Sequence, residues 1–216
     1  MKLQPVMRTD EHHRQKHEQI LRIGKERKID VVFLGDSLTR RWEDYDHLWD
    51  KCFAEFNPAN FGVGADCIEN VLWRVLNGEI DGIDPKLFLV LAGTNNLSKN
   101  TVEEIVDGIL QIVEVIRSKC PRSKVVVFGL LPRDKDENGE ECMTRIRAIN
   151  HQLEQHARCG DFVYEYFGDS LLTASGRIDK SIMPDGLHLN EDGYRIAGPI
   201  VREIIRKHMP KCCDSE

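Results

Sequence analysis

The sequence predicts an α/β protein, a three-layer α/β/α sandwich with about five parallel strands. Short apolar runs led by β-branched residues alternate with longer segments of helical period, which is the pattern of repeated βα units. At 216 residues the chain can bury one continuous core without disulfide or metal staples. Since no repeat or linker interrupts it, we expect one domain over residues 1–216, with an N-terminal helix over 1–27, a core over about 28–209 and a polar tail over 210–216.

Composition excludes several function classes. A formal net charge of -6 gives no support for a nucleic-acid partner. The first residues contain no apolar signal region, and no run approaches the roughly 20 apolar residues of a membrane span. We therefore expect a cytoplasmic protein without integral membrane association. The seven cysteines form no C-x-x-C pair and predict reduced thiols, with neither zinc-ligand nor disulfide spacing.

The first strand is the clearest element. The run Val31–Leu34 is short, apolar and β-branched at its start, which indicates a parallel strand that is covered on both faces. Gly35 permits a sharp exit, and Ser37 then stands at the carboxyl end of the strand, where open parallel sheets bind ligands. Ser37 could serve there as a nucleophile or as the cap of the next helix.

A helix over about residues 9–28 is expected to lead into this strand. His12, His13 and His17 share helical spacing on it. The Arg, Lys and Gln residues around these histidines describe a solvated face, and no acidic or cysteine ligand accompanies them in sequence. We therefore predict no metal site on this helix.

The segment after Ser37 is expected to form a short helix through Trp49. Trp42, Tyr45 and Trp49 either line a pocket or pack this helix on the sheet, and we favour packing for Tyr45 and Trp49. A second strand over residues 56–61 contains a proline, which predicts a place at the edge of the sheet. Its exit loop has two glycines two apart, a weak half of a dinucleotide fingerprint. The loop opens a helix, so its N–H groups could face an anion.

The remainder of the chain continues the alternation. A capping box of Thr101 and Glu104 begins a helix of regular apolar period. A charged surface loop over residues 133–141 shows no catalytic arrangement. The further expected elements are strands over 86–91, 124–132 with its exit loop and 161–167, and helices over 66–76, 101–117, 143–157 and 190–208.

Small, polar or titratable residues follow several strands or occupy a late loop, and parallel topology can bring them to one sheet edge. Acyl transfer needs a nucleophile, a base, an acid that orients the base, and donors for the oxyanion. In the turn-prone stretch 185–188, the Asp185 carboxylate can fold back to Nδ1 of His188 and leave the other nitrogen for Ser37. This is the hydrogen-bonding logic of a serine triad.

These residues resemble the SGNH hydrolase superfamily, also called GDSL esterases and lipases. The likeness spans roughly residues 28–209, and its motifs stand at residues 35–38, 62, 93–96 and 185–188. Further blocks at residues 60–64, 71–74 and 129–133 look most like the catalytic subunits of platelet-activating-factor acetylhydrolase and their bacterial relatives. The resemblance implies a flavodoxin-like hydrolase without metal or organic cofactor.

The resemblance also implies roles for particular residues. Ser37 is then the nucleophile, His188 the general base and acid, and Asp185 its orienting partner. The backbone N–H groups of Ser37 and Gly62 and the side-chain amide of Asn95 would form the oxyanion hole. Many members carry Gly-x-Asn-Asp where this chain has Gly-Thr-Asn-Asn over 93–96, which leaves the oxyanion asparagine in place. Asp36 is not expected to be catalytic.

The substrate is expected to be a small-molecule ester with a short acyl group. Leu38, Thr94 and Leu187 stand beside the catalytic residues and would limit acyl size, which favours acetyl. Trp42 and the two arginines before it could contact a sugar or a phosphate, or could be exposed helix-start residues. Acetylated carbohydrate, short-chain phospholipid and xenobiotic ester all remain open.

Other functions compete with this one. A lysophospholipase or thioesterase of the same superfamily is the nearest alternative, and a non-catalytic α/β binding subunit or a mononucleotide binder of flavodoxin type belongs to another class. The complete set of Ser37, Gly62, Asn95, Asp185 and His188 argues against the binding subunit, and the Asp-Gly-Leu-His block over 185–188 has no role in a mononucleotide binder. A homodimer is suggested by the resemblance alone.

Overall fold

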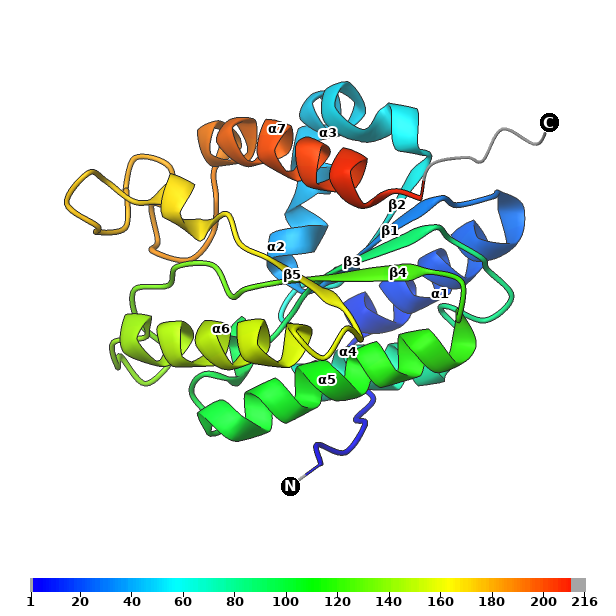
Figure 1. Ribbon diagram of the computed structural model, residues 1–216, viewed down its shortest axis with the longest axis horizontal. Helices are drawn as coiled ribbons and strands as arrows, with labels where there is room; N and C mark the ends of the chain where they lie inside the picture. Colours follow the sequence, from blue (N-terminus) through cyan, green and yellow to red (C-terminus); the bar gives the residue numbers. More distant parts are fainter. Residues whose placement is uncertain (1, 211–216) are drawn as a thin grey trace.

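The centre of the molecule is a five-stranded sheet with helices on both faces (Figure 1). The structure is a computed structural model that describes residues 2–210, so the expected tail lies outside the described residues except at Pro210. The strand order is β2-β1-β3-β4-β5, and every pairing is parallel. This confirms the predicted α/β/α sandwich. The strands are β1 (Val31–Gly35), β2 (Pro58–Gly62), β3 (Leu87–Leu91), β4 (Lys124–Phe128) and β5 (Val163–Glu165).

Strand β1 lies in the interior of the sheet, as its apolar sequence predicts. All of its residues are buried, because helices cover both of its faces. Gly35 at its end is in register with Gly62 of β2 on one side and with Leu91 of β3 on the other. The segments that follow these three strands therefore leave the sheet at the same edge. The predicted edge position of β2 is confirmed, with Pro58 as its first residue.

Two helical layers enclose the sheet, each with its own apolar core. In Figure 1 the upper layer contains α2 (Ser37–Arg40), α3 (Asp46–Phe53) and α7 (Glu191–His208). The lower layer contains α1 (Glu11–Glu26), α4 (Ile68–Leu76), α5 (Val102–Lys119) and α6 (Met143–Ala157). Short 3₁₀ turns complete the chain: η1 (Arg41–Tyr45), η2 (Ala54–Phe56), η3 (Thr94–Asn96) and η4 (Gly168–Leu171).

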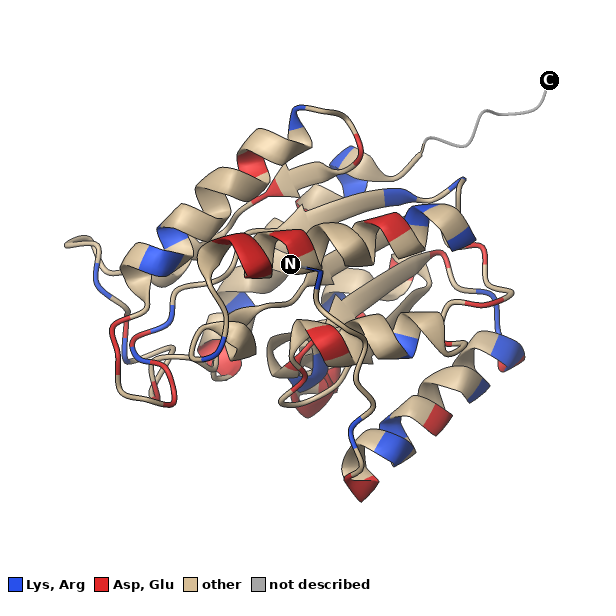
Figure 2. Cartoon of the chain, turned by 90° about the horizontal axis from the view of Figure 1, so that it is seen from below, with Lys and Arg blue, Asp and Glu red and all other residues tan. Residues whose placement is uncertain are grey.

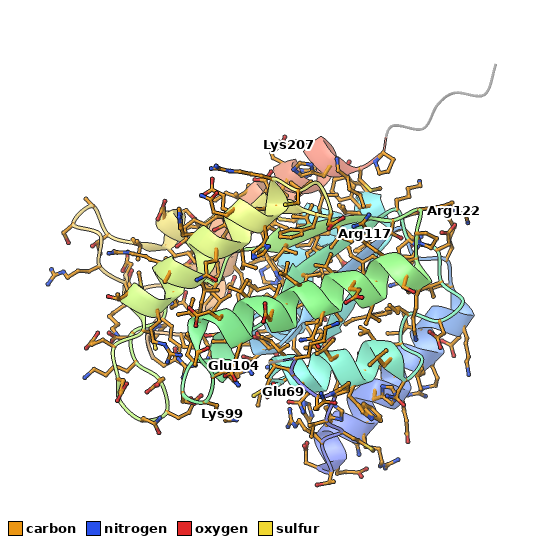
Figure 3. All side chains as sticks on the ribbon, turned by 60° about the horizontal axis from the view of Figure 1, so that its bottom comes forward. Glu69, Lys99, Glu104, Arg117, Arg122 and Lys207 are labelled. Carbon is orange, nitrogen blue, oxygen red and sulfur yellow. The ribbon has the colours of Figure 1, made fainter. Side chains whose placement is uncertain are left out.

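Side-chain hydrogen bonds at the helix ends explain where the helices begin. At α5 the Thr101 side chain accepts the N–H of Glu104, and the Glu104 carboxylate accepts the N–H of Thr101, so the predicted capping box is confirmed. Figure 3 shows Glu104 at this end of the helix and Arg117 toward the other, an arrangement that complements the helix dipole. The Asn190 side chain caps α7 by accepting the N–H of Gly193.

The solvated face that we predicted for the histidines of α1 is wrong for His13. This side chain is fully buried, and its ring lies 5.9 Å from that of Trp73 on α4. His17 lies 2.8 Å from the buried carboxylate of Glu79. Most of the charged neighbours are exposed, whereas Lys16, which pairs with Glu43 at 2.7 Å, is buried like His13 and Ile20, so the helix docks on α4 through a mixed polar and apolar stripe. Among residues 2–210, no group of three or more His, Cys, Asp or Glu residues could hold a metal ion.

The surface carries charges of both signs. Seen from below, both Lys or Arg and Asp or Glu residues lie on the exposed helices and loops (Figure 2). None of the helices within residues 2–210 is long and apolar enough to cross a membrane. The cysteines that the structure describes are all free thiols, and four of them are buried.

Candidate active site

Ser37 lies where strand β1 passes into helix α2. Asp36 caps this helix, because its Oδ1 accepts the N–H of Leu38 at 3.0 Å. The cap fixes the turn that carries Ser37, whose Oγ lies 3.0 Å from Nε2 of His188. The two residues are 151 positions apart in sequence, so the fold itself brings them together.

The loop before α7 supplies the partners of Ser37. Nδ1 of His188 lies 2.7 Å from Oδ2 of Asp185, while Oδ1 of Asp185 accepts the N–H groups of Leu187 at 2.9 Å and of His188 at 2.7 Å. Gly186 allows this tight turn with a φ of 77°. Partial burial raises the pKa of Asp185, but the hydrogen bonds from His188 and Leu187 outweigh it and lower the pKa to about 2.

Ser37, His188 and Asp185 therefore form one hydrogen-bonded chain. An ionised Asp185 holds the proton of His188 on Nδ1, which leaves Nε2 as an acceptor that faces the Ser37 hydroxyl. Such a chain can move a proton from a serine hydroxyl to an imidazole as the serine attacks a carbonyl carbon. The three residues that we expected to meet do so.

Asn95 lies beside the loop that follows β2. Its Nδ2 donates to the carbonyl of Asp66 at 2.8 Å. Because an amide group carries two hydrogens, one of them anchors the side chain and the other is available to a ligand. The hydrogen bond to Asp66 therefore gives the Asn95 amide a fixed orientation.

The N–H of Gly62, which we expected to be an oxyanion donor, already has an acceptor in the structure. This N–H donates to Oδ1 of Asn60 at 2.9 Å. A Cβ at this position would lie 2.3 Å from the backbone nitrogen of Arg40, so glycine is required for α2 to pack closely on β2. The glycine signal in the sequence thus has a packing explanation.

Ala65 is a candidate site residue that the sequence analysis did not include. It lies in the turn Val63–Asp66, which is closed by a hydrogen bond of 3.3 Å from the N–H of Asp66 to the carbonyl of Val63. Ala65 has a φ of 63°, a conformation that is costly for a residue with a Cβ. Within residues 2–210, its N–H has no hydrogen-bond acceptor. The structure draws attention to Ala65 because it is a non-glycine residue with a positive φ and stands next to Asp66, the residue to which Asn95 is hydrogen-bonded. In the sequence, only the order Gly-Ala-Asp after a strand points to this turn.

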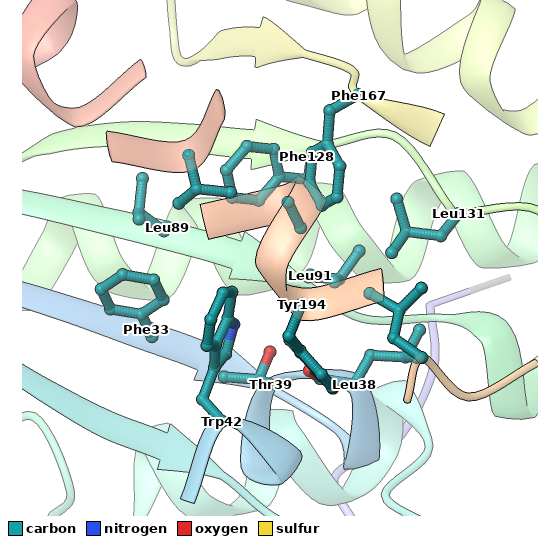
Figure 4. Close-up of a pocket in the computed structure, with 13 residues that line it drawn as sticks. Phe33, Leu38, Thr39, Trp42, Leu89, Leu91, Phe128, Leu131, Phe167 and Tyr194 are labelled. Atoms are coloured by element: carbon teal, nitrogen blue, oxygen red, sulfur yellow. Dashed lines mark hydrogen bonds between the residues drawn. The ribbon is translucent and has the colours of Figure 1, made fainter. Parts of the chain in front are cut away.

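Most of the expected substrate-contact residues are buried. Leu38 and Thr94 are each 3% exposed, and only Leu187 presents part of its surface to solvent. The alternative of Trp42 as an exposed helix-start residue is wrong, because Trp42 is 5% exposed and packs on Tyr194 with a ring separation of 4.5 Å, while its contact with substrate stays a prediction. Figure 4 shows Trp42 and Leu38 around an apolar cavity of about 20 Å³ below the site.

The expected packing of Trp49 is confirmed. Its ring lies 4.8 Å from that of Phe33 on β1 and 5.2 Å from that of Phe53. Tyr45 is partly exposed and stacks on Tyr194 with a ring separation of 5.4 Å. These aromatic residues fix the short helices after Ser37 to the sheet and to α7.

Buried polar groups lie behind the nucleophile. Asp36 is 1% exposed, and burial raises its pKa to about 7. Its Oδ2 and the hydroxyl of Thr94 have no hydrogen-bond partner among the described residues. Arg133 is 4% exposed and donates to the carbonyl of Thr94 at 2.8 Å, so its assignment to a charged surface loop is wrong.

The parallel sheet and the Ser, His and Asp chain at its carboxyl edge define an α/β ester hydrolase of the SGNH type. The model of the GDSL-like Lipase/Acylhydrolase family matches residues 33–196. The chain belongs to this family, and the family resemblance drawn from its motifs is confirmed.

Named relatives agree with this assignment. The chain is 39% identical over 199 residues to rat platelet-activating factor acetylhydrolase IB subunit alpha2, covering 91% of this chain and 85% of that protein. It is 34% identical over 193 residues to human subunit alpha1, covering 87% and 79%. The crystal structure of a GDSL-like lipase from Bacteroides thetaiotaomicron has the same fold, with a TM-score of 0.75, 17% identity and coverage of 88% and 97%.

Proposed function

We propose that the protein is a serine esterase that removes a short acyl group, with acetyl preferred, through an acyl-enzyme. The observation that carries this proposal is the hydrogen-bonded chain from Ser37 through His188 to Asp185, with separations of 3.0 and 2.7 Å. Both distances are in the range that proton transfer requires.

The proposed reaction has two halves. Ser37 Oγ attacks the ester carbonyl as Nε2 of His188 takes its proton, and the resulting tetrahedral intermediate collapses when His188 returns that proton to the leaving alcohol. Water then attacks the acyl-serine with His188 as base, and the acid leaves as Ser37 regains its proton. Asp185 stabilises the imidazolium in both halves and remains ionised.

Three donors are proposed for the oxyanion. They are the N–H of Ser37 at the start of α2, the second amide hydrogen of Asn95, and the N–H of Ala65 in place of that of Gly62. This choice is supported by the hydrogen bond that occupies the Gly62 N–H and by the absence of an acceptor for Ala65 in the described residues. Preorganised donors of this kind stabilise charge that develops in the transition state.

A short acyl group is supported by the packing around Ser37. Leu38 and Thr94 are buried, and Leu187, the residue before His188, is half-buried. The apolar cavity beside Leu38, at about 20 Å³, has room for no more than about one water molecule. The names of the rat and human relatives also specify an acetylhydrolase. These names describe subunits, and a homodimer and a cytoplasmic location stay predictions here.

The test is ester hydrolysis over a series of acyl chain lengths, with chelator present. Wild type should hydrolyse p-nitrophenyl acetate faster than the longer esters, and Ser37→Ala should lower kcat by at least about 10⁴-fold. Ser175→Ala, at an exposed serine, should match wild type. A maximum at long chains would favour a lysophospholipase or thioesterase, and an active Ser37→Ala variant would contradict the serine mechanism.

A further inference from the structure

The first residues of the chain run along helix α4 toward the candidate site. The N-terminal arm, defined as residues 2–10, lies below the sheet in Figure 1. The N–H of Val6 donates to the carbonyl of Glu69 at 3.0 Å, and the Asn70 side chain donates to the carbonyl of Val6 at 2.9 Å. The arm lies outside the segment that the family model matches, which begins at residue 33.

Arg8 carries the arm onto the turn Val63–Asp66, which we call the oxyanion turn. Its Nη1 donates to the carbonyl of Gly64 at 2.5 Å and to Oδ1 of Asp66 at 3.0 Å. Its Nε donates to Asp10 at 2.9 Å, which orients the guanidinium. These contacts hold the residues on both sides of Ala65.

Asp66 connects Arg8 to Asn95. The side chain of Asp66 is fully buried, and its Oδ2 accepts Nε of Arg74 at 2.7 Å. Its backbone carbonyl accepts the Asn95 amide at 2.8 Å. A displacement of Asp66 would therefore move both the Asn95 side chain and the Ala65 N–H.

Arg74 secures the same turn from the interior. Besides Asp66, this buried guanidinium donates to the carbonyl of Phe61 and to that of Gly35, each at 3.1 Å. Arg74 thus ties the turn to strands β1 and β2. On the solvent side, Arg8 is the guanidinium that closes the turn, with a side chain that is 23% exposed.

We propose that Arg8 is a positioning residue for the oxyanion hole, a role that rests on the proposed ester hydrolysis. By fixing Gly64 and Asp66, Arg8 limits the movement of the turn and keeps the Ala65 N–H and the Asn95 amide directed at the same point. Donors that are already oriented assist the transition state more than the bound ester. Loss of Arg8 should therefore lower kcat and leave KM nearly unchanged.

The experiment is a double-mutant cycle with p-nitrophenyl acetate. Arg8→Met should lower kcat by about tenfold, since a small misplacement of catalytic groups has effects of this size or larger. Arg8→Lys, which keeps the charge but forms fewer directed hydrogen bonds, should lie between Arg8→Met and wild type. In an Asn95→Ala background, Arg8→Met should lower kcat by less than it does in wild type, because only the Ala65 N–H then remains for Arg8 to position.

Arg14→Met is the matched control, because Arg14 is an exposed arginine of α1 that pairs only with Glu11 and Glu18 within the described residues. It should leave kcat at the wild-type value. Thermal melting of each variant reports folding, and Arg8→Lys carries the test if Arg8→Met is unfolded.

Three outcomes would overturn the role of Arg8. They are an unchanged kcat in Arg8→Met, a rise in KM without a fall in kcat, or an equal fall in kcat with and without Asn95. Activity that survives in Ser37→Ala would instead contradict the proposed serine mechanism. The failure of one proposal is thus distinguishable from the failure of the other.

Discussion

The two sides of the candidate site are held in opposite ways. On the triad side, Asp185 is 55% exposed, and its hydrogen bonds come from Leu187 and His188, at most 3 positions away. On the oxyanion side, Asp66 and Arg74 are fully buried, and their partners include Arg8 at 58 positions and Gly35 at 39 positions. The Asp185 end of the triad is local and exposed, although Ser37 is buried and 151 positions from His188, whereas the network around Asp66 is buried and joins distant parts of the chain.

This difference separates catalysis from stability. A substitution in the exposed loop should lower the rate of the reaction but should change the free energy of unfolding little, because few buried contacts are lost. A change in the buried network removes the partner of a buried charge, which costs far more than the loss of an exposed ion pair. Substitutions on the two sides should therefore have distinct signatures.

The largest expected effect is on the triad side. Asp185→Asn should lower kcat by about 10⁴-fold, because the amide no longer fixes the His188 tautomer or stabilises its charged form. The free energy of unfolding should change by less than about 1 kcal/mol, because the carboxylate is exposed. Ester kinetics and urea denaturation of the same preparation check both parts. A large loss of stability would show that Asp185 contributes to folding as the buried residues do, and would contradict the difference between the two sides.

A smaller effect is expected on the oxyanion side. Asp66→Asn should lower the free energy of unfolding by about 3 to 5 kcal/mol, because it leaves a buried guanidinium with less compensation. The control is Asp134→Asn, which loses an exposed pair with Lys180 and should cost less than about 1 kcal/mol. Urea denaturation measures both. Equal losses in the two variants would show that burial does not distinguish the two sides.

The smallest effect concerns Asp36, which stands between the two sides. Burial raises its pKa to about 7 from an ordinary value of 3.8, so between these pH values the folded protein keeps this proton while the unfolded chain releases it. Stability from this group is therefore fully present below pH 3.8 and is lost as the pH rises toward 7.

Asp36→Asn keeps an oxygen for the Leu38 N–H and removes this titration. Relative to wild type, the variant should gain on the order of 1 kcal/mol or more in unfolding free energy between pH 4 and pH 7. Denaturation of both proteins at the two pH values provides the measurement. A difference that does not change with pH would show that Asp36 is already ionised in the folded protein.

The comparison also explains what could be predicted from the sequence. Strand β1 was predictable because a run buried on both faces needs only apolar residues, and α5 because its capping box and apolar period are local signals. The meeting of Asp185 with His188 follows from a turn of four residues. Their encounter with Ser37 follows from the rule that parallel strands end at one edge.

The rest depends on contacts between distant residues. His13 has polar neighbours, and only the position of α4 shows that it is buried beside Trp73. The sequence around Arg133 predicts an exposed charged loop, and only its hydrogen bond to the carbonyl of Thr94 shows that it is buried. We predicted Gly62 as an oxyanion donor from the family resemblance, but its N–H donates to Asn60. The N–H of Ala65 has no acceptor among the described residues, and an alanine in a sequence does not predict a positive φ.

The position of the N-terminal arm has a practical consequence for preparing the protein. A recombinant piece trimmed to the limits of the family match, residues 33–196, would lack Arg8 and all of α1, and would uncover the α4 surface that His13 and Ile20 now cover. Such a piece would also lose part of β1 and most of α7, and even a piece that keeps these elements but begins after residue 10 would have its oxyanion turn held from one side only. The cloning boundary should therefore precede the arm, and a purification tag at that end should be removable.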